Sequence, residues 1–160
     1  MVTTRLGGTG EAPVPAADPR TPEEFFADCP QGLEIYAAVH ALLAALGPVE
    51  VRVSRSYVGF RRSRGFAYLW RPGRWLRAPA AEVVLSFTLD HALTAPRIKE
   101  VVHPSRRLWI HHVELHHAAD LDDDIAGWLA EAHRQAAARP DRRGRGRAYR
   151  PAGALSRRSA

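Results

Sequence analysis

The stretch VEVRVSRSYVGFRRSRGFAYLWR, residues 49–71, decides the fold because its apolar side chains recur at every second position. Within residues 49–54, three valines alternate with a glutamate, an arginine and a serine. This pattern is typical of a strand with one buried face. Residues 57–62 and 65–71 show similar short runs bounded by Ser, Arg or Gly. Together the three segments predict an antiparallel meander.

The strand pattern continues toward the C-terminus. Residues 82–89 place four large apolar side chains on one face by the same alternation. Residues 107–117 predict a final long strand, and the string IKEVVHP, residues 98–104, predicts a less regular one. We therefore expect a sheet of about five strands.

Helical patterns precede the strands. Thr21 is in the N-cap position of a short helix, with Pro22 as its first residue and Glu24 placed to complete a capping box. Residues 31–47 then repeat their apolar positions with a helical period and end on Gly47, a typical C-cap residue. The sequence thus predicts two helices before the first strand.

A further helix is expected after the last strand, within residues 119–138, with Asp120 as its N-cap. Apolar stripes on helices at both ends need the apolar face of the sheet for burial. We therefore predict an α+β fold: a two-layer sandwich with a mainly antiparallel sheet and the N- and C-terminal helices packed on one face.

The ends of the chain differ in composition from its middle. Residues 1–20 are rich in Gly, Pro, Ala and Thr, and residues 139–160 in Arg, Gly, Pro and Ser. Such segments bury too little apolar surface to order themselves. The expected organisation is a disordered N-terminal tail, a single α+β domain over residues 21–138 and a disordered arginine-rich C-terminal tail.

The positive charge is unevenly distributed. The net charge is +6, but residues 139–160 contain eight arginines against Asp141 alone, so the rest of the chain sums to about −1. Within the domain, residues 52–77 hold eight arginines and no acid. This local excess predicts a positive surface on the meander. Its arginines are Arg52, Arg55, Arg61, Arg62, Arg64, Arg71, Arg74 and Arg77.

Composition argues against several classes of protein. The hydrophobic fraction is 46%, yet no apolar run is long enough to cross a membrane. The N-terminal residues lack the apolar core of a secretory signal, and the only cysteine, Cys29, has no partner for an internal disulfide. We expect a cytoplasmic protein that does not associate with membranes.

Several strings, in this order, resemble the bacterial domain of unknown function 5655 family over roughly residues 21–137. They are TPEEFF, ALGPVEVRVSRSYVGFRRSRGFAYLWRPGRWLRAP, KEVV, HHVEL and LDDDIAGWL. Members of that family typically have tryptophan before KEVV, where this chain has Ile98. The resemblance implies no activity, cofactor or catalytic residue.

The string HHVELHH, residues 111–117, offers an alternative site. On a strand, His112, Glu114 and His116 share one face at spacings that allow them to ligate one Zn²⁺. The competing interpretation is a solvated polar face, since no second cluster of ligands supports a metal. His111 points to the apolar face and is expected to be a hydrogen-bonded core histidine.

No catalytic motif emerges from the sequence, and no cofactor is expected unless Zn²⁺ binds. The acidic run at residues 122–124 fits the first turn of a helix, where carboxylates are favoured. We therefore interpret it as capping.

The leading functional hypothesis is a non-enzymatic binding module whose arginine-rich hairpins and tail contact an acidic partner such as nucleic acid. Aromatic rings among the arginines would stack on bases, Trp75 among them. By alternation, Phe66, Tyr68 and Trp70 share a face and are expected in the core. The alternative is a protein that binds an anionic small molecule, or a metal through His112, Glu114 and His116.

Overall fold

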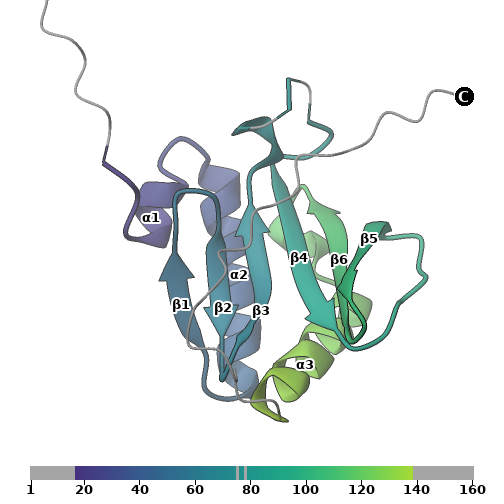
Figure 1. The fold of residues 1–160 in the computed structure, drawn as a ribbon. Coiled ribbons are helices and arrows are strands. Elements are labelled where there is room, and N and C mark those ends of the chain that lie inside the picture. The colour runs from purple at the N-terminus through teal and green to yellow at the C-terminus, as the bar shows by residue number, and fades with distance from the viewer. Residues whose placement is uncertain (1–16, 75, 78, 139–160) are drawn as a thin grey trace, which may run out of the picture.

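The computed structural model describes residues 17–74, 76–77 and 79–138 of the chain. Three α-helices and six strands make up most of this part (Figure 1). In chain order they are α1 (Pro22–Phe25), α2 (Pro30–Leu46), β1 (Glu50–Val53), β2 (Val58–Arg61), β3 (Gly65–Trp70), β4 (Val83–Leu89), β5 (Ile98–Ser105), β6 (Leu108–Leu115) and α3 (Asp123–Ala138).

The six strands form one antiparallel sheet with the order β1-β2-β3-β4-β6-β5. The first four strands are neighbours in sequence order, as a meander requires, and the β5–β6 hairpin adds to β4 through β6. The predicted α+β class is confirmed. The sheet has six strands because the less regular segment, residues 98–104, forms the edge strand β5.

The N-terminal helices begin and end as their sequences predict. Thr21 caps α1 through its side chain, which accepts a hydrogen bond from the Glu24 amide at 3.1 Å. The Glu24 carboxylate accepts in return from the Thr21 amide at 3.3 Å, which completes the capping box. Helix α2 ends before Gly47, whose φ of 145° is accessible to glycine and strained for other residues.

The start of α3 differs from the sequence prediction at one residue. Asp120 was expected to be the N-cap, but its carboxylate accepts from the amides of His116 and His117, at 2.8 and 3.0 Å, in the turn before the helix. Asp122 has the capping role instead, because its Oδ1 accepts from the Ile125 amide at 3.0 Å. The acidic run thus contributes to capping as predicted.

The hydrophobic core lies between the sheet and the two long helices, which both lie behind the sheet in Figure 1. Alternate residues of β4, from Val83 to Leu89, are at most 1% exposed and form its centre. Phe87 stacks on Trp128 of α3 with 5.8 Å between ring centroids. This contact docks the C-terminal helix on the sheet, and Ile125 and Leu129 are fully buried beside it.

The prediction that Phe66, Tyr68 and Trp70 are core residues on one face is wrong for two of them. Phe66 is fully buried, but Tyr68 and Trp70 are only half-buried and lie on the face away from the helices. The cause is a register shift between β2 and β3, next to Phe66. A bulge of this kind places one more residue on the core side than strict alternation allows.

No helix among the described residues is long and apolar enough to cross a membrane.

Candidate functional site

The arginines that are close in sequence divide between opposite ends of the sheet. The turns of residues 62–64 and 54–57 connect β2 to β3 and β1 to β2, so they lie at opposite ends of β2. The segment after Trp70 leaves β3 at the same end as residues 54–57. A six-residue strand spans roughly 17 to 20 Å. The run of eight arginines therefore does not make one continuous surface.

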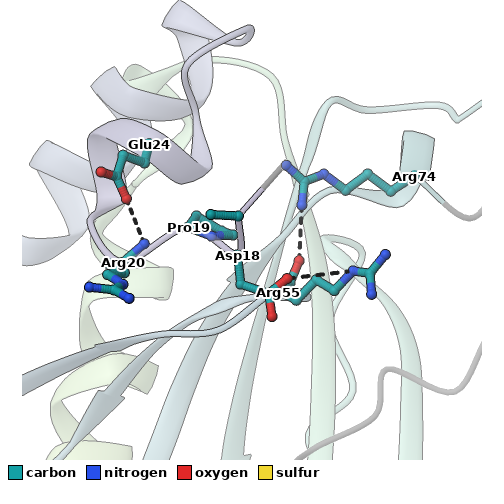
Figure 2. Close-up of a pocket in the computed structure, with 7 residues that line it drawn as sticks. Asp18, Pro19, Arg20, Glu24, Arg55 and Arg74 are labelled. Carbon is teal, nitrogen blue, oxygen red and sulfur yellow. Dashed lines mark hydrogen bonds and ion pairs between the residues drawn. The ribbon is translucent and has the colours of Figure 1, made fainter. Parts of the chain in front are cut away.

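At one end of the sheet, beside α1, the arginines are engaged within the chain. Arg71 forms an ion pair with Asp28. Arg74 donates to the carbonyl oxygens of Arg55 and Phe25, at 2.9 and 3.3 Å, and its guanidinium lies 4.6 Å from the Phe25 ring centroid. Figure 2 shows Arg74 and Arg55 converging beside Asp18, whose Oδ1 is 3.8 Å from Arg55 Nε. These contacts organise the fold at the α1 end.

The α1 end is close to electrical balance. Its arginines are Arg20, Arg55, Arg71, Arg74 and Arg77, and its carboxylates include Asp18, Glu24, Asp28 and Glu82. An open depression of about 730 Å³ there is lined by residues of both signs. Arg77 is exposed, and the predicted Trp75 lies outside the described residues. Of the remaining predicted arginines, Arg52 pairs with Glu50 on β1 at 2.8 Å.

At the opposite end of the sheet, the β2–β3 turn is anchored on α3. Arg62 Nη1 lies 3.5 Å from His133 Nδ1, and Arg64 Nη2 donates to the Gln135 carbonyl at 3.3 Å. His133 Nε2 is 3.2 Å from the Pro48 carbonyl, so a neutral ring can donate there and accept from Arg62. Burial lowers the pKa of His133, which favours this neutral form.

The β5–β6 turn lies at this same end. Leu89, the last residue of β4, pairs with Trp109, and the turn holding Arg106 and Arg107 immediately precedes β6. Both arginines are exposed. In the sheet order, the middle of the β5–β6 hairpin is three strand positions from the middle of the β2–β3 hairpin. Because neighbouring strands lie about 4.8 Å apart, the two turns are roughly 15 Å apart. Next to this turn the rings of His103 and Trp109 stack with 3.9 Å between centroids.

Helix α3 also ends here, at Ala138, the last described residue before the arginine-rich stretch 139–160 of the sequence. An open depression of about 490 Å³ is lined by Arg61 and Arg62 of the β2–β3 hairpin, by Glu50 of β1 and by Ala137 of α3. In Figure 1 the yellow-green end of α3 lies beside the lower ends of β2 and β3. The surface made by the two turns is called the basic end below, and consists of Arg61, Arg62, Arg64, Arg106 and Arg107.

His111 is a core histidine, as the sequence predicts. Its ring is fully buried and stacks on Phe87 with 5.0 Å between centroids, and its Nε2 accepts from the Leu93 amide at 3.0 Å. Desolvation lowers its pKa, so the neutral ring is favoured.

His112 belongs to a hydrogen-bonded chain on the face of the sheet away from the helices. Trp70 Nε1 donates to Ser86 Oγ at 2.8 Å, and Ser86 Oγ lies 2.6 Å from His112 Nδ1. Because Ser86 accepts from Trp70, its own proton is available to His112, which leaves the proton of the neutral ring on Nε2. Burial, reinforced by repulsion from His111, lowers the pKa of His112 to about 4.

A serine beside an imidazole can form a nucleophile and base, but access decides whether a substrate reaches it. Ser86 is 0% exposed, and Trp70 donates to the same hydroxyl. The chain therefore satisfies buried polar groups and holds three strands in register.

The three predicted metal ligands on the histidine segment are not brought together. His112 Nδ1 is engaged by Ser86, Glu114 lies 3.7 Å from Lys99 Nζ, and His116 is exposed beyond the end of β6. Among the described residues, these three side chains do not form a group whose ligand atoms all lie within 4.8 Å of one another.

The described chain does bring one such group together, formed by Asp90, His91 and Glu131. The sequence does not indicate this group because Glu131 is 40 residues from His91, and only the docking of α3 beside the end of β4 joins them. The only local sign of this group in the sequence is that a carboxylate and an imidazole are adjacent at Asp90 and His91. The Glu131 carboxylate raises the pKa of His91 by hydrogen bonding.

The chain is an α+β protein with helices on one face of an antiparallel sheet. Residues 23–136 match the model of the family described as domain of unknown function (DUF5655), and the chain belongs to that family. Comparison with curated proteins and with solved structures gives no match.

Proposed function

We propose that this protein is a non-enzymatic binding module whose basic end contacts a nucleic acid. The observation that carries the proposal is the position of the β2–β3 and β5–β6 turns. Both lie at the end of the sheet where α3 finishes and the arginine-rich residues 139–160 begin. Three basic segments, far apart in sequence, would thus act on one partner.

The β5–β6 turn of the basic end can offer charge to a partner more readily than the paired arginines of the α1 end. Arg106 and Arg107 are exposed, and neither forms an ion pair with any described residue. By contrast, Arg55 and Arg71 have carboxylate partners. A guanidinium that is not neutralised within the chain gains more from a phosphate, because binding releases the counterions of the nucleic acid.

The spacing of the turns suits a phosphate backbone. Two arginine-bearing turns roughly 15 Å apart can contact separate phosphates of one nucleic-acid strand. The His103 and Trp109 rings beside the β5–β6 turn add a stacking surface for unpaired bases.

The lone Cys29 is buried as a thiol, which suits the cytoplasmic location that we propose.

Two double variants of the full-length chain test this proposal with equal changes of charge. Arg106→Ala with Arg107→Ala is expected to weaken binding to a short single-stranded oligonucleotide about tenfold at low salt. It should also reduce the slope of log affinity against log salt by about one to two. Fluorescence anisotropy titrations at several salt concentrations give both quantities.

The matched control is Arg55→Ala with Arg77→Ala, which removes two exposed arginines from the α1 end. It should change affinity by less than about threefold, through long-range charge alone. Equal losses in the two double variants would mean that binding follows net charge and that the basic end has no special role.

The depression between Arg61, Arg62 and Ala137 favours a second candidate function, the binding of an anionic small molecule. A free phosphate or carboxylate ligand would compete with the oligonucleotide for these arginines. Millimolar inorganic phosphate should then displace the oligonucleotide from the native chain. Loss of this displacement in Arg61→Ala would support the alternative.

A further inference from the structure

We propose that Asp90, His91 and Glu131 form a binding site for a divalent transition-metal ion such as Zn²⁺. Asp90 and His91 directly follow β4, and Glu131 lies on α3. Each side chain offers one ligand atom, and the three atoms lie within 4.8 Å of one another. One imidazole nitrogen and two carboxylate oxygens are a ligand set that Zn²⁺ accepts.

A fourth side chain holds both carboxylates in place. Gln135 Nε2 donates to Asp90 Oδ1 at 2.9 Å and to Glu131 Oε1 at 3.0 Å. Its Oε1 accepts from the Asp90 amide at 2.9 Å. The second oxygen of each carboxylate stays available to an ion. Gln135 thus orients the two carboxylates in the way that hydrogen-bond partners behind metal ligands do in known sites.

The His91 ring is oriented for ligation by its Nε2 atom. Nδ1 lies 3.3 Å from the Ala92 carbonyl, the kind of acceptor that fixes the tautomer of a metal-bound histidine. Nε2 faces Glu131 Oε1 at 2.6 Å, so an ion would replace the hydrogen bond between these two groups. The side chains of His91 and Glu131 are 44% and 30% exposed, which leaves room for water to complete the coordination.

Calorimetric titration of the full-length protein, prepared without a histidine tag, with ZnCl₂ at neutral pH tests the site. We expect one saturable Zn²⁺ per chain. His91→Ala and Glu131→Gln should each weaken binding at least tenfold, and Gln135→Ala should weaken it about tenfold by freeing the carboxylates.

His116→Ala is the control for incidental binding, because this exposed histidine lies outside the group. It should leave Zn²⁺ affinity unchanged. The proposal is overturned if no saturable binding is seen, if His91→Ala binds as the native chain does, or if His116→Ala causes the larger loss. In those cases His91 and Glu131 form only an ion pair.

Discussion

Phe87→Ala is expected to lower the free energy of unfolding by about 3 to 5 kcal/mol, the cost of truncating a buried aromatic ring and leaving a cavity. Phe87 is 0% exposed and lies between the sheet and α3. Its ring stacks on His111, with 5.0 Å between centroids, and on Trp128, with 5.8 Å. The substitution therefore removes the contact that joins the two layers. Urea denaturation followed by circular dichroism measures the change.

Leu46→Ala is the comparison for Phe87→Ala. Leu46 is 43% exposed at the end of α2, so its truncation should change stability by less than about 1 kcal/mol. A loss at Phe87 no larger than the loss at Leu46 would mean that α3 does not dock through this ring.

Acidification from pH 7 to pH 4 is expected to destabilise the protein by about 2 to 3 kcal/mol through His112 alone. Its pKa is about 4 in the folded chain, against 6.5 as the ordinary value. Between these two values the unfolded chain binds the proton more readily than the folded chain does. Stability should therefore rise with pH across this window and be lost as pH falls through it.

The readout is the slope of stability against pH, compared between the native chain and His112→Gln. The variant loses the hydrogen bond to Ser86 and is less stable throughout, but its slope between pH 4 and 6.5 should be shallower. His111 and His133, whose pKa values are also lowered, keep part of the slope, and His91 opposes it because its pKa is raised. Equal slopes in the native chain and His112→Gln would show that His112 is not buried as a neutral ring.

Local rules explain why so much of the fold follows from the sequence. The capping box at Thr21 and Glu24 and the glycine after α2 depend on neighbours within four residues, and the structure has both. Alternation along β4 likewise identifies the core face, because that strand is regular over its whole length. Where a strand is irregular, alternation fails. The bulge beside Phe66 moved Tyr68 and Trp70 to the face away from the helices.

The candidate site was harder to predict because it depends on the paths of the strands between its residues. Arg61 and Arg71 are ten residues apart in sequence but lie at opposite ends of β3. Arg106 is far from Arg62 in sequence, yet the sheet order brings both turns to one end. Charge counts within a window cannot distinguish these cases. The same holds for Glu131, which reaches His91 only through the docking of α3.

The most direct test of the proposed interface is a chemical-shift map of the ¹⁵N-labelled full-length protein titrated with a short single-stranded oligonucleotide at low salt. Residues 139–160 should respond to any polyanion, so the decisive signals come from the domain. We predict the largest shifts in the turns at residues 62–64 and 106–107. Shifts concentrated at residues 54–57 and 71–74, or confined to the C-terminal tail, would contradict the assignment of the basic end as the binding surface.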